Sequence, residues 1–178
     1  MDMSGSITIP NWKTEKKFIK SLVKAIGISP TGGHAAVTLF DKRAKLKIKF
    51  SDHKNFNSFK TALLSLRRAG GGTRIDLGLE VALDQMFTVS NGMRPTSAKS
   101  VVLITDGTND KKWDSAAWRN KFRARNITLI VIGAGKVNKA ELEKLVDNPS
   151  DLHIASDMEA LKMGEFFRGV GKALCNGK

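Results

Sequence analysis

Residues 101–107 read Val-Val-Leu-Ile-Thr-Asp-Gly, and residues 127–132 read Ile-Thr-Leu-Ile-Val-Ile. Both stretches are almost continuously apolar and rich in β-branched residues, and a helical pattern separates them along the chain. Strands of this composition that alternate with helices are typical of a parallel sheet covered on both faces. The two stretches therefore predict an α/β fold with a doubly wound, mainly parallel sheet.

The rest of the chain fits this Rossmann-like class, because amphipathic helical patterns alternate with short β-rich runs. No internal repeat or low-complexity linker divides it, so we expect one domain over residues 1–178. Helices are expected from Pro10 to Ile26 and at about 54–67, 75–87, 113–124, 138–147 and 158–174. Further strands are expected at 35–40, 44–50 and 152–155.

Residues 44–50 alternate strictly between apolar residues and lysines. Lys45, Lys47 and Lys49 therefore point to one side of a half-buried hairpin strand, which we expect to be the antiparallel edge strand of the sheet. Lysines on an edge strand commonly prevent pairing with other chains. Alternatively, these three lysines bind a polyanion, and both interpretations stay open at this point.

The charge balance is the unusual feature of the composition. The 178 residues include 30 Lys and Arg against 17 Asp and Glu, which gives a formal net charge of +13, while 41% of the residues are hydrophobic. A strongly basic globular domain indicates a polyanionic partner, such as nucleic acid, sulfated glycan, acidic protein or an anionic surface. No stretch approaches the length of an apolar membrane span.

Oxygen-bearing side chains stand where the strands of this sheet are expected to end, which is where doubly wound folds bind ligands. Asp2, Ser4 and Ser6 alternate, so an extended segment would project all three side chains to one side. Thr73 follows three glycines, and Asp106 follows a buried strand. All five are hard oxygen donors, which Mg²⁺, Mn²⁺ and Ca²⁺ prefer, whereas zinc and copper favour His or Cys.

These residues make the chain resemble the von Willebrand factor type A domains, which include integrin inserted domains and many extracellular matrix modules. The metal-ion-dependent adhesion site of that family has the pattern Asp-x-Ser-x-Ser, then a distant Thr, then a distant Asp. The three parts match Asp2-Met3-Ser4-Gly5-Ser6, Gly71-Gly72-Thr73 and Thr105-Asp106-Gly107. The resemblance implies that a divalent cation is held, directly or through water, by Asp2, Ser4, Ser6, Thr73 and Asp106.

The start of the chain departs from the family pattern. In the family the first motif stands at the end of a buried central strand, but here only Met1 precedes Asp2. The resemblance therefore implies a domain truncated at its N-terminus that lacks its first central strand. Many extracellular members close the domain with a disulfide, so the resemblance also implies that Cys175 is half of a pair whose partner lies in the missing part.

Motifs for enzymatic chemistry are incomplete. Gly133-Ala134-Gly135-Lys136 begins like a dinucleotide-binding turn, but Asn138 stands where the next glycine is needed, and no Gly-x-Ser-x-Gly elbow accompanies the three histidines. We therefore expect no catalytic activity. Trp113 and Trp118 have basic neighbours, but Trp113 is more simply interpreted as part of a core-facing stripe, so nucleic acid is a poor candidate partner.

Together these observations predict a secreted, non-catalytic adhesion or extracellular matrix module. Its metal site is expected to bind an Asp or Glu residue of an extracellular protein, while its basic surface attracts acidic matrix proteins or sulfated glycans. The alternative is a metal-independent module that binds a polyanion, either sulfated glycan or acidic matrix and mineral. An intracellular ATPase-associated domain or a metal-dependent hydrolase ranks last, because neither a phosphate loop nor a nucleophile elbow is present.

Overall fold

The computed structural model describes residues 1–176, with the side chains of residues 1–174. The final two residues of the predicted domain over 1–178 therefore lie outside the described residues. The side chain of Cys175, the expected half of a disulfide, also lies outside them.

Helices and strands alternate through the described residues as the sequence predicts. The α-helices are α1 (Ile9–Ile26), α2 (Phe56–Ser65), α3 (Ile75–Val81), α4 (Ser115–Ala124), α5 (Lys139–Glu143) and α6 (Gly164–Asn176). The strands are β1 (Val37–Phe40), β2 (Ala44–Ile48), β3 (Lys99–Thr105), β4 (Ile127–Ala134) and β5 (Leu152–Ala155). Short helical turns are η1 (Ala82–Met86), η2 (Val89–Asn91), η3 (Pro149–Asp151) and η4 (Met158–Lys162). None of the helices described here has the length and apolar character needed to cross a lipid bilayer.

Five strands and the first three residues of the chain make up the sheet. β3, β4 and β5 are parallel neighbours in that order, and β1 pairs with β2 as an antiparallel hairpin. Residues 1–3 join the two parts, because the N–H of Met3 donates to the carbonyl of Phe40 (2.8 Å) and the N–H of Asp2 donates to the carbonyl of Ile104 (3.2 Å). The prediction of a mainly parallel sheet with an antiparallel edge strand is confirmed.

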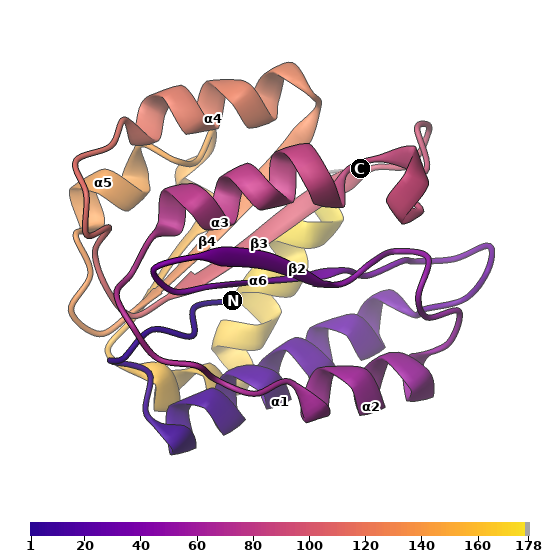
Figure 1. The fold of residues 1–178 in the computed structure, drawn as a ribbon, viewed down its shortest axis with the longest axis horizontal. Coiled ribbons are helices and arrows are strands. Elements are labelled where there is room, and N and C mark those ends of the chain that lie inside the picture. Colours follow the sequence, from indigo (N-terminus) through magenta and orange to yellow (C-terminus); the bar gives the residue numbers. More distant parts are fainter. Residues whose placement is uncertain (177–178) are drawn as a thin grey trace.

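Helices cover both faces of this sheet (Figure 1). α1, α2 and α6 share one buried apolar cluster with the sheet, and α3, α4 and α5 share the other. α1 begins where the hydroxyl of Thr8 accepts the N–H of Asn11 at 3.2 Å, with Pro10 in its first turn. Trp12 and Phe18 then lie on its buried face, which fixes α1 beneath the start of the chain.

Two predicted helices are interrupted. The expected helix over 158–174 breaks at Met163, which has an extended backbone (φ −72°, ψ 131°) between η4 and α6. The expected helix over 75–87 leaves α-helical geometry after Val81 and continues as the π-helical turn Ala82–Met86. Apolar spacing continues across both breaks, so periodicity predicts the buried face of a segment but not the change in its hydrogen bonding.

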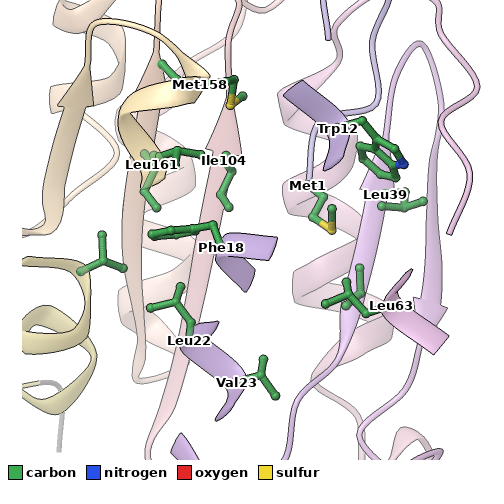
Figure 2. Close-up of a cluster of buried hydrophobic side chains, with 14 of the residues drawn as sticks. Met1, Trp12, Phe18, Leu22, Val23, Leu39, Leu63, Ile104, Met158 and Leu161 are labelled. Atoms are coloured by element: carbon green, nitrogen blue, oxygen red, sulfur yellow. The ribbon is translucent and has the colours of Figure 1, made fainter. Parts of the chain in front are cut away.

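Residues 1–3 lie in the centre of the sheet, between β1 and β3. The ammonium group of Met1 is buried and donates a hydrogen bond to the carbonyl of Thr38 at 3.1 Å. Figure 2 shows the Met1 side chain between the strand that carries Ile104 and the strand that carries Leu39. The structure therefore has three residues at the position where the family resemblance implies a longer central strand.

A cavity of about 170 Å³ continues from Met1 between β1 and β3. Its lining includes Leu22 of α1, Leu79 of α3 and Val102 of β3. The two helix layers therefore reach the same cavity from opposite faces of the sheet. Elsewhere, sheet backbone separates the two layers.

Candidate metal site

The candidate site lies at the edge of the sheet where residues 1–3 and β3 end. Asp2 is fully buried there, and both of its carboxylate oxygens accept hydrogen bonds. The hydroxyl of Thr105 donates to Oδ2 at 2.7 Å, and the N–H of Ser4 donates to Oδ1 at 2.8 Å. These bonds fix the orientation of the Asp2 carboxylate. The sequence analysis did not assign this role to Thr105, although Thr105 directly precedes the predicted ligand Asp106.

The segment after Met3 turns back on itself. Residues 4–7 form a bend and a turn, so the prediction of an extended segment with three side chains on one side was wrong. The physical reason is the bond from the Ser4 N–H to the Asp2 side chain, which closes a local turn. The turn still gathers the predicted residues, because the hydroxyl oxygens of Ser4 and Ser6 lie 3.0 Å apart. Ser4 is buried and Ser6 is exposed.

Asp106 joins this group from the end of β3. The hydroxyl of Ser6 donates to Asp106 Oδ1 at 2.7 Å, which completes a hydrogen-bonded series from Ser4 through Ser6 to Asp106. Burial raises the pKa of the Asp106 carboxyl; the bond from Ser6 opposes this shift, and the charge of Asp2 adds to it. A cation near both carboxylates would favour their ionised forms.

Thr73 is held beside the same loop by a residue that the sequence analysis did not identify. The N–H of Thr73 donates to Asp110 Oδ2 at 2.6 Å, and the N–H of Asp110 donates to the carbonyl of Thr73 at 2.8 Å. A side chain at Gly72 would collide with the Asp110 carboxylate, so the close approach requires glycine. A Cβ at Gly107 would lie 3.5 Å from Thr73 Oγ1, which places this hydroxyl beside the Asp106 turn.

A further carboxyl, that of Glu15 in α1, is buried beneath the start of the chain. Neither of its oxygens has a hydrogen-bond partner among the described residues. Burial raises the pKa of Glu15 well above its usual value; the ammonium of Met1 opposes this shift and the charge of Asp2 adds to it. The spacing from Trp12 through Glu15 to Phe18 is helical, and this pattern is a signal that position 15 faces the core.

The donor set fits a hard divalent cation. The described residues contain no group of three or more His, Cys, Asp or Glu side chains that could hold a metal. Two carboxylates and several neutral hydroxyls make a site of oxygen donors, which suits Mg²⁺, Mn²⁺ or Ca²⁺. The predicted ligands of such a cation remain Asp2, Ser4, Ser6, Thr73 and Asp106.

Two of the three predicted polyanion-binding lysines lie on β2, and the third directly follows it. Lys45, Lys47 and Lys49 are exposed, and β2 is the edge strand of the sheet. Lys45 and Lys47 border a small cavity, and Lys49 lies two residues further along the chain.

A family model described as von Willebrand factor type A domain matches residues 1–168. Matrilin-2 of Mus musculus is 24% identical over 178 residues, which cover 98% of this chain and 18% of the relative. The collagen alpha-1(XII) chain of Notophthalmus viridescens is 24% identical over 176 residues, or 99% of this chain and 19% of the relative. The chain thus spans about a fifth of the length of these two relatives.

Solved structures show the same fold. Proximal thread matrix protein 1 from the mussel byssus has a TM-score of 0.90 and 25% identity, over 98% of this chain and 46% of that one. A second structure of the mussel protein, with the same scores, is described as having a zinc-occupied MIDAS motif. Manganese-loaded TRAP protein of Plasmodium vivax has a TM-score of 0.71 and 23% identity, over 94% of this chain and 70% of that one. None of these matches indicates a catalytic family.

Proposed function

The chain belongs to the von Willebrand factor type A domain family, and on that basis we propose that it is a non-catalytic module that binds an acidic residue of an extracellular protein through a divalent cation. The observation that carries this proposal is the hydrogen-bonded series from Ser4 through Ser6 to Asp106. It joins the first and third sequence motifs at one edge of the sheet. Thr73, from the second motif, lies beside the same turn.

The charge of the site supports an external ligand for the cation. Asp2 and Asp106 together roughly balance a divalent ion, while the hydroxyl donors are neutral. When bound, such an ion would act as an electrophile that accepts one more oxygen ligand. Ser6 is the exposed member of the set, whereas Asp2 and Ser4 are buried. A carboxylate of the partner would therefore approach from the side of Ser6.

The relatives support an extracellular setting for this chain. Matrilin-2, a collagen chain and a byssal thread matrix protein support a place in the extracellular matrix, with a protein partner that offers Asp or Glu. The zinc in the mussel protein and the manganese in the TRAP protein support a divalent cation. For this chain we propose Mg²⁺, Mn²⁺ or Ca²⁺ because its donors are carboxylates and hydroxyls.

Calorimetric titration with Mn²⁺ after treatment with EDTA tests the metal site. Asp106→Ala should abolish the binding heat, and Ser4→Ala should weaken the affinity about tenfold, since each removes an oxygen donor. Asp147→Asn, which removes a partly exposed carboxylate outside the site, is the matched control and should bind Mn²⁺ like the wild type. Equal Mn²⁺ affinity in Asp106→Ala and the wild type would rule out the site. A peptide with a central Asp should then bind only with the cation, and its Asn counterpart should not bind.

The basic strand supports a second candidate function, the binding of a polyanion without metal. Lys45, Lys47 and Lys49 are exposed, and none takes part in an ion pair within the described side chains. Retention on an immobilised sulfated glycan in EDTA tests this function. Retention should fall steeply as salt rises, because released counterions drive such binding. Retention that is lost in EDTA would contradict this function and support the first.

A further inference from the structure

We infer that a cavity between β2 and the segment after α2 binds a sulfate group of a sulfated glycan, an inference that rests on the second proposed function and extends it. The cavity has a volume of about 140 Å³. Its lining consists of four cationic side chains and two apolar ones, with no carboxylate: Arg43, Lys45, Lys47, Arg67, Met3 and Ala69.

Three of the cations come from one local pattern. Lys45 and Lys47 are two residues apart on β2, so they point to the same side of the strand, and Arg43, just before the strand, lines the same cavity. Leu46 lies half-buried in the opposite cluster, against α3 and its neighbours. The lysine side of β2 therefore faces the layer that contains α1 and α2.

The fourth cation, Arg67, comes from a segment that is fixed at both ends. The ammonium group of Lys16 donates to the carbonyls of Leu64 (2.7 Å) and Leu66 (3.1 Å), just before Arg67. The N–H of Gly70 donates to the carbonyl of Met3 at 3.0 Å, just after it. These bonds hold the segment against the start of the chain and opposite the lysines of β2.

The four cations have no acidic partners in the described part of the chain. All six ion pairs there involve other residues, and no side-chain hydrogen bond reaches the charged groups of Arg43, Lys45, Lys47 or Arg67. Four like charges around one small cavity repel one another, so an anion bound among them lowers the electrostatic energy. Protection of the edge strand explains the lysines but does not explain Arg67, which lies outside the strand.

The chemistry of the lining favours a tetrahedral oxyanion. A guanidinium group presents a planar pair of donors that matches two oxygens of a sulfate, and lysines add mobile point charges. Lys45 and Lys47 of β2 form a short row of cations about 6.8 Å apart along the strand. A ligand with regularly repeated anionic groups fits this row better than an isolated phosphate, and a sulfated glycan has this chemistry.

The cavity also lies next to the candidate metal site. Met3, which lines it, stands between Asp2 and Ser4, and the guanidinium of Arg68 donates to the carbonyl of Ser4 at 2.9 Å. A bound glycan would therefore lie beside the loop that carries the oxygen ligands. The glycan nevertheless needs no metal, because its contacts are to the cations alone.

The test is calorimetric binding of a sulfated hexasaccharide to the full chain in EDTA at several salt concentrations. Arg67→Ala and Lys47→Ala should each weaken binding about tenfold and lower the slope of log affinity against log salt by about one. Lys24→Ala is the control, because it removes an exposed cation of α1 and changes the net charge by the same amount. It should change the affinity less than twofold. Thermal unfolding confirms that the variants are folded.

The outcomes separate the site from the broader function. Equal losses of hexasaccharide affinity in Arg67→Ala and Lys24→Ala would contradict binding in the cavity. They would still agree with diffuse binding of a polyanion to the basic surface. No binding by the wild type would overturn the cavity and the second proposed function together, whereas the metal titration would stand. Tighter binding of a phosphopeptide or of free sulfate than of the hexasaccharide would overturn the glycan assignment.

Discussion

The space between β1 and β3 is filled in two different ways along its length. At the carboxyl edge, residues 1–3 bond to both strands, and the buried polar side chains of Asp2 and of Thr105 at the end of β3 are hydrogen-bonded to each other. Further along, the same two strands border a cavity of about 170 Å³ with a mostly apolar lining. One end is thus polar and closed by backbone hydrogen bonds, and the other is apolar and open.

The geometry of the metal edge depends on a small number of hydrogen bonds around Asp2. Buried polar groups are stable only when their hydrogen bonds are made. The Asp2 carboxylate is held by bonds from Ser4 and Thr105, and the backbone of residues 1–3 is held by bonds to β1 and β3. We therefore expect the geometry of the site to be sensitive to residues 1–3 and tolerant of changes around the cavity.

We expect the greatest loss of stability from a substitution that removes a backbone hydrogen bond at the closed end. Met3→Pro removes the N–H that donates to Phe40 and should lower the free energy of unfolding by about 2 to 3 kcal/mol. Met3→Leu keeps the donor and the apolar volume, so it should lose less than about 1.5 kcal/mol. Urea unfolding measures both. Equal stability of the two variants would show that this bond does not hold the sheet together.

Metal binding at the closed end should raise the free energy of unfolding, and a substitution at the open end should not alter this gain. If the proposed site is correct, Mn²⁺ at 100 times its dissociation constant raises the free energy of unfolding by about 2.7 kcal/mol. Asp106→Asn should remove this gain, and Ala36→Ile, on the cavity lining, should keep it in full. Urea unfolding with Mn²⁺ or EDTA compares the three proteins. A gain that survives in Asp106→Asn would place the bound ion elsewhere.

The pH dependence of stability should reveal the buried Glu15 beneath the closed end. Its pKa is raised in the folded state, so unfolding releases a proton and stability falls as pH rises from the ordinary glutamate pKa towards the folded value. Between pH 5 and 6 in EDTA the free energy of unfolding should therefore decrease. His153, whose pKa burial lowers, contributes to the pH dependence with the opposite sign.

Glu15→Gln isolates the contribution of Glu15, because His153 remains in both proteins. The difference in unfolding free energy between the variant and the wild type should change with pH in this window. A constant difference from pH 5 to 6 would show that Glu15 titrates normally in the folded protein.

A substitution that fills part of the cavity at the open end should change stability least. Ala36→Ile adds apolar atoms to the cavity lining and should raise the free energy of unfolding by about 1 kcal/mol. Ala44→Ile, at a half-buried position on β2 away from the cavity, is the matched control and should gain less. Thermal unfolding measures the pair. A loss of stability in Ala36→Ile would mean that the cavity walls cannot accommodate added volume.

The sheet and most helices could be predicted because each strand is a continuous apolar run and each helix has an apolar face. The breaks at Met163 and after Val81 could not, since they change backbone hydrogen bonding without changing the apolar pattern. The cavity could not be predicted from apolar patterns either, because it depends on how far apart β1 and β3 lie.

The candidate ligands could be named because three motifs occur in the order of a known family. Their support could not be predicted in the same way. Asp110 reaches Thr73 through a loop whose path the sequence does not specify. The turn after Met3 depends on one bond to the Asp2 side chain. Helical periodicity places Glu15 on the buried face of α1. Glutamate usually prefers solvent, however, so the residue type argues against the burial that the spacing predicts.

The buried ammonium group of Met1 has a practical consequence for recombinant production. Any tag or linker fused to this end would begin inside the sheet, between β1 and β3, rather than at the surface. A hydrophilic affinity tag would place polar residues against the apolar cavity lining, whereas a leading stretch of β-branched residues matches that lining. The first few residues of a fusion protein are therefore expected to affect its yield and solubility.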